Sequence, residues 1–309
     1  MKLVFLDALT LGDINLDKFK EFADVEIYQT TNKNQTIQRL QNVDIVCTNK
    51  VVIDKEVMDN TNLKMIQILA TGMNNVDLEY AKQKGIIVKN VAGYSTNSVA
   101  QLTFAMVLNI INKISYYDNY AKNEYSNSEI FTHIVDFNEL NGKRWGIIGL
   151  GEIGKKVANI AQSFGCEVVY YSTSGKNNNA DYKQVSLEEI LGSDIISIHA
   201  PLNEKTNNLL NKNNLTLIKE KAILINMGRG GIVNEQDLAD ICDKNNFFAG
   251  FDVFSSEPIK KDNPLLTIKN IILTPHIAWA SVEAREKLVD LAYKNIEEFI
   301  NGKDNEKAL

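Results

Sequence analysis

Cysteine is scarce in this chain of 309 residues: Cys47, Cys166 and Cys242 are the only three and lie far apart. An odd number of distant cysteines does not make a disulfide framework, and two of the three fall inside expected strands. We therefore expect buried free thiols in a reducing compartment. None of the three has the surroundings of a metal ligand, so the sequence predicts no metal site.

A basic surface and a long apolar run are also missing. The 33 Lys and Arg residues against 39 Asp and Glu leave a formal net charge of -6, with no basic cluster suited to nucleic acid or an anionic membrane. No apolar stretch approaches the roughly 20 residues that a membrane-spanning helix needs, and the strand-like N-terminus predicts no signal peptide. These absences predict a cytoplasmic protein with no nucleic-acid and no membrane partner.

What is present is an alternation of short apolar runs with polar, helix-like segments. Strands separated by helices imply parallel βαβ units, covered on both faces. The sequence therefore predicts the α/β class, with two doubly wound parallel-sheet domains. The expected strands lie at 3–6, 25–28, 44–47, 65–69, 86–91, 145–150, 166–171, 194–199, 221–227, 247–253 and 271–274.

Two segments interrupt this alternation. A capping-box pattern beginning at Ser98 predicts the start of a helix that runs to about Ile114 and is apolar on nearly every side, typical of a buried connector between domains. The following segment, 116–142, has no clear periodicity and is expected to be a loop, a lid or an oligomer arm. It contains His133, which we interpret as a surface histidine.

Residues 149–154 read G-L-G-E-I-G, between the expected strand 145–150 and a helix over 155–164. In this context the glycines let a dinucleotide pyrophosphate lie against free N–H groups at the helix N-terminus. An ordinary tight turn is the alternative. The flanking strand and helix favour the nucleotide.

Three side chains with reactive groups follow strands of the second half: Arg229, Glu257 and His276. Each alone has an ordinary reading as a surface charge, a solvated acid or a loop histidine. Because carboxyl ends of parallel strands share one edge of a sheet, we expect them to converge beside the cofactor. Arginine grips a carboxylate at two points, and histidine paired with a carboxylate exchanges a proton near neutral pH.

At this point the whole chain resembles the D-isomer-specific 2-hydroxyacid dehydrogenases. The motifs at 149–154, 199–201, 226–230, 252–258 and 274–279 occur in that family's order. The resemblance implies a flavodoxin-like substrate domain, a Rossmann-type NAD(P)-binding domain and a cleft between them. The patterns place the substrate domain at 1–97 plus 281–309 and the nucleotide domain at 98–280.

The resemblance also assigns roles. It makes Arg229 the ligand of the substrate carboxylate, His276 the acid/base and Glu257 its partner, with Thr71, Gly72 and Trp279 around the substrate. Trp279 has an alternative reading as interdomain core. The implied cofactor contacts are Thr71, Gly149, Gly151, Glu152, Ile153, Gly154, Ser172, Thr173, Lys176, Ala200, Met227, Gly228, Asp252 and Ala278.

The motifs look most like the glycerate dehydrogenase (hydroxypyruvate reductase) branch. They imply reversible hydride transfer between a nicotinamide cofactor and a small D-2-hydroxyacid/2-ketoacid pair, either hydroxypyruvate/D-glycerate or glyoxylate/glycolate. A D-lactate or broad 2-ketoacid reductase, and a non-enzymatic NAD(H)-sensing scaffold, remain alternatives. Family resemblance also implies a homodimer, with the segment after Ile114 as a candidate contact.

One position departs from the family pattern. Where the family usually has an acid that binds the adenosine ribose, this chain has Ser172, followed by Thr173 and Lys176. Without that carboxylate a 2′-phosphate is not repelled, and hydroxyls with a lysine can hold one. We therefore expect NADP(H) use, alone or beside NAD(H). The alternative is that Ser172 bonds the ribose of NAD while Lys176 is solvated.

Overall fold

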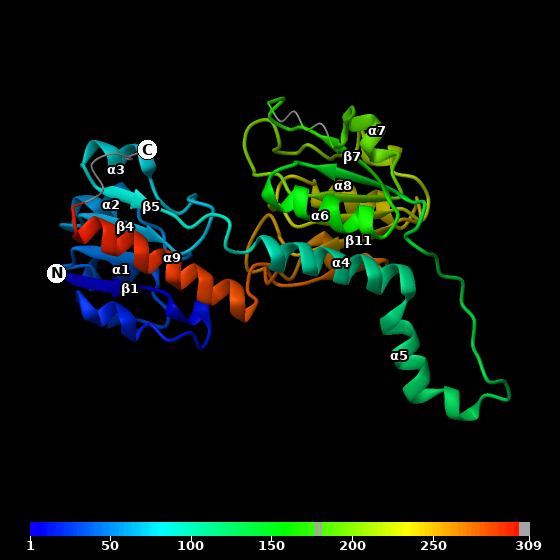
Figure 1. Cartoon of the computed structure of the whole chain (residues 1–309), viewed down its shortest axis with the longest axis horizontal. Coiled ribbons are helices and arrows are strands. Elements are labelled where there is room, and N and C mark those ends of the chain that lie inside the picture. Colours follow the sequence, from blue (N-terminus) through cyan, green and yellow to red (C-terminus); the bar gives the residue numbers. More distant parts are fainter. Residues whose placement is uncertain (177–178, 180, 303–309) are drawn as a thin grey trace. The chain divides into compact units, whose positions relative to one another are not determined.

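The structure is a computed structural model that describes residues 1–176, 179 and 181–302 (Figure 1). It divides into two compact units. The first comprises Met1–Ser95 and the chain from Ala280 on, and the second comprises Thr96–Trp279. The chain thus leaves the first unit two residues earlier, and re-enters it one residue earlier, than the sequence patterns indicate.

The first unit is built on a five-stranded sheet in the order β2-β1-β3-β4-β5, with every pairing parallel. This is the flavodoxin-like order. All residues of β3 and β4 are buried, as expected for central strands that are covered on both faces. The strands are β1 (Lys2–Phe5), β2 (Asp24–Ile27), β3 (Ile45–Thr48), β4 (Met65–Ile68) and β5 (Ile87–Lys89).

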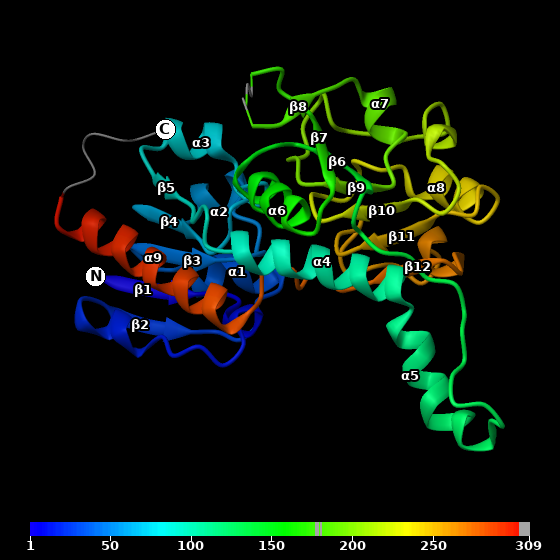
Figure 2. The same ribbon diagram turned by 45° about the vertical axis from the view of Figure 1, so that its right-hand side comes forward.

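Polar side chains start the helices of the first unit by accepting hydrogen bonds from otherwise free N–H groups. Asp77, for example, accepts from the Tyr80 N–H at 3.0 Å. The C-terminal helix buries Leu288, Ala292 and Ile296 and packs on β4 (Figure 2). The helices are α1 (Lys33–Arg39), α2 (Lys55–Asp59), α3 (Leu78–Gln83) and α9 (Val282–Ile300).

The second unit has a seven-stranded parallel sheet in the order β12-β11-β10-β9-β6-β7-β8. Counted from β6, this is the Rossmann order with one further strand, so the prediction of two doubly wound parallel-sheet domains is confirmed. The two-residue edge strand β8 was not predicted. The strands are β6 (Arg144–Ile148), β7 (Glu167–Tyr171), β8 (Lys183–Gln184), β9 (Ile195–Ile198), β10 (Ile223–Asn226), β11 (Phe248–Phe251) and β12 (Ile271–Leu273).

The apolar helix of the connector region is α4 (Thr96–Asn112), and the expectation that it is buried is confirmed for one face, where Val99, Phe104 and Val107 join the core around Trp145. The capping box expected at Ser98 is wrong, because the helix already begins at Thr96. The Ser98 hydroxyl instead donates to the Ala278 carbonyl at 2.6 Å. Three further helices of this unit are α6 (Glu152–Ser163), α7 (Leu187–Leu191) and α8 (Glu235–Cys242).

The segment 116–142 is not a plain loop. A helix, α5 (Ile114–Asn123), forms where no periodicity was recognised, and none of its residues is buried. The chain then returns irregularly, and the Tyr117 hydroxyl ties the two limbs by bonding both the N–H and the carbonyl of Val135, at 2.8 and 2.9 Å. We call residues 114–139 the arm; it projects from the rest of the second unit (Figure 1).

The three cysteines are buried free thiols, as expected. Burial raises the pKa of Cys166 to about 11 and that of Cys242 to about 12, so both stay protonated at neutral pH. Across the described ranges, no helix has both the length and the apolar character that crossing a membrane requires.

Candidate active site

The glycine turn joins β6 to α6 in the second unit, and two of its glycines have no room for a side chain. A Cβ on Gly154 would lie 2.3 Å from the Gly149 carbonyl oxygen, and one on Gly149, where φ is +93°, would lie 3.0 Å from the backbone of Ala200. Gly151 differs, since a Cβ there would meet nothing within 4 Å. The turn is therefore closed on its inner side and open at Gly151.

Helix α6 begins at this open side. Gly151 is its N-cap, and no side chain caps the helix. The first N–H groups of a helix and its dipole favour an anion, and the missing Cβ lets a phosphate approach the backbone closely. These residues fit the pyrophosphate of a dinucleotide cofactor.

The neighbouring strand β7 ends in the segment expected to face the adenosine ribose. Ser172 is buried, and its Oγ has no hydrogen-bond partner among the described residues. The chain then turns through Gly175, whose N–H donates to the Ser172 carbonyl at 3.3 Å, and Lys176 is exposed. No carboxylate stands at residues 172–176.

Arg229 follows β10 in a tight loop. The Asn226 amide donates to the Arg229 carbonyl at 3.1 Å and accepts from the Gly228 N–H at 3.1 Å, which fixes the loop's backbone. A Cβ on Gly230 would lie 1.8 Å from the Phe254 carbonyl oxygen. Only glycine fits there, so the Arg229 loop lies directly against the loop that carries Glu257.

His276 and Glu257 form an ionisable pair. The His276 Nδ1 lies 2.6 Å from Glu257 Oε2, while Glu257 Oε1 accepts from the Phe254 N–H at 3.1 Å. Their side chains are 22% and 29% exposed, so solvent or substrate can reach them. His276 also has a left-handed backbone, with φ at +54°, a conformation that few residues other than glycine adopt and that is found at many functional sites.

Asp252 holds the His276 loop in place. This buried carboxylate follows β11 and accepts from the Thr274 hydroxyl at 2.6 Å and from the N–H groups of Ile277 and Ala278 at 2.9 Å each. Burial raises the pKa of Asp252, while these hydrogen bonds oppose the rise. The end of β12 is thereby tied to the end of β11.

Glu235 was missed in the sequence. It opens α8, and its carboxylate accepts from the Ser255 N–H and hydroxyl at 2.6 Å each and from the Asn263 amide at 2.8 Å. It therefore links the helix after the Arg229 loop to the loop before Glu257. Its place as the first helical residue after a capping Asn234 was the available signal, but that signal indicates only a helix start.

The other two histidines lack this setting. His133 lies on the arm, stacked on Tyr120 with ring centroids 4.1 Å apart, and its Nε2 lies 2.8 Å from the Tyr116 hydroxyl. Burial lowers the pKa of His199 to about 3, so this imidazole is neutral at physiological pH. Of the three, His276 is the one placed for proton transfer.

The remaining expected contacts are distributed over both units. Thr71 and Gly72 follow β4 in the first unit, where Thr71 is exposed, and Trp279 ends the second unit half-buried. The side chains of Ala200, Met227 and Ala278 are buried in the second unit. Within the described residues, no three His, Cys, Asp or Glu side chains are grouped as a metal ion would require.

A Rossmann-type sheet whose glycine turn has room for a pyrophosphate, with a His–Glu pair at the ends of neighbouring strands, is typical of nicotinamide-dependent oxidoreductases. Comparison with known proteins narrows the class. Residues 104–278 match the family model of the NAD binding domain of D-isomer specific 2-hydroxyacid dehydrogenases. The chain belongs to this family, which confirms the resemblance drawn from its motifs.

Relatives match over nearly the whole chain. The sequence is 39% identical to a hydroxypyruvate reductase of Blautia hydrogenotrophica over 98% of both chains. It is 34% identical to a glyoxylate reductase of Thermococcus litoralis over 92% of this chain and 89% of the relative. Among solved structures, an acyclic imino acid reductase in complex with NADPH and D-Arg matches with a TM-score of 0.87 and 32% identity over 98% of both chains.

The second and third glycines of the turn, Gly151 and Gly154, allow cofactor binding and stability to be tested separately. Gly154→Ala forces a Cβ onto the Gly149 carbonyl and should cost about 1–3 kcal/mol of unfolding free energy. Gly151→Ala meets no neighbour and should cost less than about 1 kcal/mol, yet its methyl group stands where a phosphate approaches, so the NADH Kd should rise about tenfold. Denaturant titration and NADH fluorescence measure the two effects. Unchanged NADH binding by Gly151→Ala would contradict the assignment of the turn.

Proposed function

We propose that this chain reduces a small 2-ketoacid to its D-2-hydroxyacid, with hydroxypyruvate or glyoxylate as substrate. The observation that carries the proposal is the His276–Glu257 pair at 2.6 Å, beside the Arg229 loop. The hydroxypyruvate reductase and glyoxylate reductase among the relatives support these two substrates.

In this mechanism the Arg229 guanidinium binds the substrate carboxylate in a fork, which orients the neighbouring carbonyl. When bound, the nicotinamide cofactor supplies the hydride. Because Nδ1 of His276 is engaged by Glu257, its Nε2 is the atom that donates a proton to the carbonyl oxygen during reduction and accepts it back during oxidation. Glu257, in contact with Nδ1, fixes the ring's orientation.

Residues of both units are proposed to bind the substrate and the cofactor. We assign substrate binding to Thr71 and Gly72 of the first unit together with Arg229, His276 and Trp279 of the second, and cofactor binding mainly to the second unit. Thr71 of the first unit is one proposed cofactor contact. The proposed cofactor contacts in the second unit are Gly149, Gly151, Glu152, Ile153, Gly154, Ser172, Thr173, Lys176, Ala200, Met227, Gly228, Asp252 and Ala278. A cytoplasmic location fits the buried free thiols.

The acid/base assignment is tested with His276→Gln. Loss of a positioned proton donor should lower kcat for hydroxypyruvate by about 10²–10⁴-fold while the NADH Kd stays within about twofold. His133→Gln, which changes a histidine on the arm, is the control and should leave kcat within about twofold. Stopped-flow or steady-state absorbance of NADH measures both.

The wild-type protein also separates the alternatives. Cofactor binding without turnover of hydroxypyruvate, glyoxylate or pyruvate would support the non-enzymatic scaffold. A higher kcat/KM for pyruvate than for hydroxypyruvate would support the D-lactate or broad 2-ketoacid reductase, because a pocket that bonds the terminal hydroxyl discriminates against pyruvate.

A His276→Gln protein that keeps more than a tenth of kcat would overturn the proposed mechanism.

We further propose that NADPH is used at least as well as NADH. The support is the absence of a carboxylate at residues 172–176, the unpartnered Ser172 hydroxyl and the exposed Lys176. Ser172→Asp should lower kcat/KM for NADPH at least tenfold, through repulsion of the 2′-phosphate, and leave NADH little changed. Steady-state kinetics with NADH and NADPH measure this preference. A strong preference for NADH that Ser172→Asp leaves unchanged would contradict the proposed role of Ser172.

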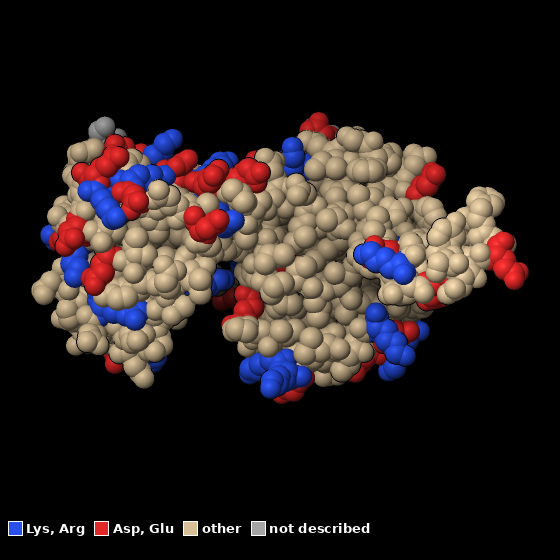
Figure 3. Space-filling model, turned by 90° about the horizontal axis from the view of Figure 1, so that it is seen from below, with Lys and Arg blue, Asp and Glu red and all other residues tan. Residues whose placement is uncertain are grey.

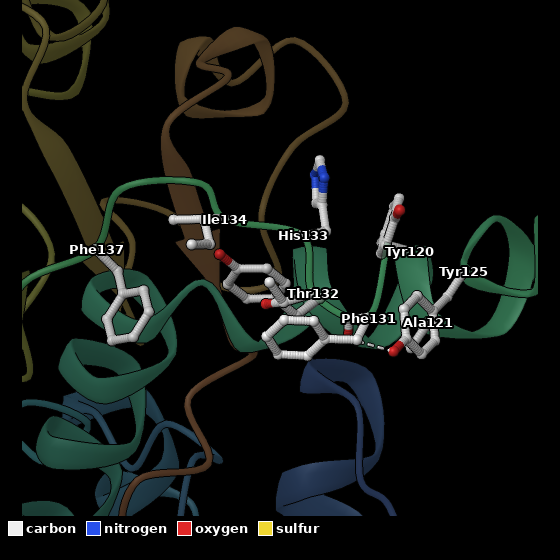
Figure 4. Close-up of a pocket in the computed structure, with 9 residues that line it drawn as sticks. Tyr120, Ala121, Tyr125, Phe131, Thr132, His133, Ile134 and Phe137 are labelled. Atoms are coloured by element: carbon white, nitrogen blue, oxygen red, sulfur yellow. Dashed lines mark hydrogen bonds between the residues drawn. The ribbon is translucent and has the colours of Figure 1, made fainter. Parts of the chain in front are cut away.

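A homodimer formed through the arm is the last part of the proposal. Phe131 is 91% exposed, and Ile130, Ile134 and Phe137 beside it are also exposed. Phe131, Ile134 and Phe137 line, with three tyrosines, a hollow of about 400 Å³ (Figure 4). Figure 3 shows uncharged surface over much of one face of the arm. So much exposed apolar surface on one projection is typical of a protein interface.

Phe131→Asp tests whether the arm forms the dimer interface. The Tyr125 hydroxyl bonds the Phe131 carbonyl, not its ring, so the substitution spares the arm's own hydrogen bond and should convert dimer to monomer. Leu266→Asp, at an apolar side chain 50% exposed elsewhere in the second unit, is the control and should leave the mass unchanged. Light scattering coupled to size exclusion gives the mass; a wild-type monomer excludes this dimer.

A further inference from the structure

Asp7 is a buried carboxylate in the first unit, two residues beyond the end of β1 and 6% exposed. Its two oxygens accept from three consecutive N–H groups of the loop after β3. The distances are 2.9 and 3.1 Å from Asn49, 2.6 Å from Lys50 and 3.3 Å from Val51. Three successive N–H groups that converge in this way form an anion-binding nest, and Asp7 fills it.

The nest lies at an informative point of the sheet. In the order β2-β1-β3-β4-β5 the chain turns to opposite sides after β1, so the crevice between the ends of β1 and β3 is the topological switch point. Folds of this type bind ligands at that crevice. Here the chain's own carboxylate occupies it, so Asp7 organises the edge and does not leave an anion site there.

The loop that Asp7 holds is bonded in turn to the loop after β4. The Val51 carbonyl accepts from the Asn75 amide at 3.0 Å, and the Ile53 N–H donates to the Asn75 carbonyl at 2.8 Å. The Ile53 carbonyl then accepts from the Asp77 N–H at 3.2 Å. A continuous set of hydrogen bonds therefore runs from Asp7 to the segment 70–77.

The same segment is anchored on its other side. The Thr71 hydroxyl donates to the Val91 carbonyl at 3.0 Å, and the Asn90 amide donates to the Thr71 carbonyl at 2.7 Å. Thr71 and Gly72 thus stand between two clamps, one from residues 90–91 and one from Asp7 through residues 49–53. Removing either clamp would loosen the loop without touching a ligand.

We infer that Asp7 is a positioning residue that sets the Thr71–Gly72 loop for the ketoacid. The inference rests on the proposed function, which places the substrate against that loop. Charge-assisted hydrogen bonds are stronger than neutral ones, and a misplacement of about 1 Å in a substrate-binding group is enough for large kinetic losses. Neutralising Asp7 should therefore act on substrate binding at a distance.

Asp44 offers a matched control, because it also links β1 and β3 but at the amino ends of these strands. It precedes β3 and accepts from the Lys2 N–H at 2.8 Å, with Lys64 2.7 Å away. Asp7→Asn should raise KM for hydroxypyruvate about tenfold, change kcat less than about threefold and raise the NADH Kd by no more than about threefold, because Thr71 is the one proposed cofactor contact in this loop. Asp44→Asn should lower Tm but leave KM within about twofold. Asn75→Ala, which cuts the relay without a buried charge, should repeat the KM effect if Asp7→Asn does not fold.

Hydrogen exchange of the amides of 69–77, followed by mass spectrometry, tests the relay without any activity. Exchange there should speed up at least fivefold in Asp7→Asn and Asn75→Ala, and stay near wild type in Asp44→Asn. If the wild type turns over no ketoacid, the proposed function fails while the exchange experiment still decides the relay. Equal exchange, or equal KM, in Asp7→Asn and Asp44→Asn would overturn the positioning role.

Discussion

The contact between His276 and Glu257 is the interaction on which the proposed chemistry depends. It joins side chains from the loops after β12 and β11, two strands that pair in parallel and so end on the same edge of the sheet. A carboxylate at 2.6 Å orients the imidazole and leaves its Nε2 for a substrate. The rest of the second unit holds these two loops and the neighbouring Arg229 loop in fixed positions relative to one another.

Glycine residues help to hold these loops because they let backbone segments approach each other closely. Gly230 lies so near the Phe254 carbonyl that no side chain fits, and Gly154 stands in the same relation to Gly149. The first contact presses the Arg229 loop against the Glu257 loop, and the second seats α6 under the glycine turn. Both contacts bring backbone directly against backbone, which suits a site that must hold substrate and cofactor at reacting distance.

Both units use a buried aspartate after a strand to tie down a neighbouring loop. Asp252 accepts from the N–H groups of Ile277 and Ala278, and Asp7 accepts from those of residues 49–51. In each case the charge is balanced by backbone dipoles at the carboxyl edge of a parallel sheet. The second unit thereby fixes the loop of its proton donor, and the first fixes the loop after β3 beside its expected substrate contacts.

The sequence by itself determined every described strand except the short edge strand β8, as well as the glycine turn and the residue types at the strand ends. Buried parallel strands need unbroken apolar runs, and a phosphate turn needs glycine at set spacing. Tertiary structure alone decided the rest. Helix α5 buries none of its residues and consists largely of Tyr, Asn, Ser and Asp, which are weak helix formers, so its sequence did not predict a helix. The roles of Ser98, Glu235 and Asp7 depend on partners distant in the sequence. For example, 42 residues separate Asp7 from Asn49, and no local pattern encodes a hydrogen bond over that separation.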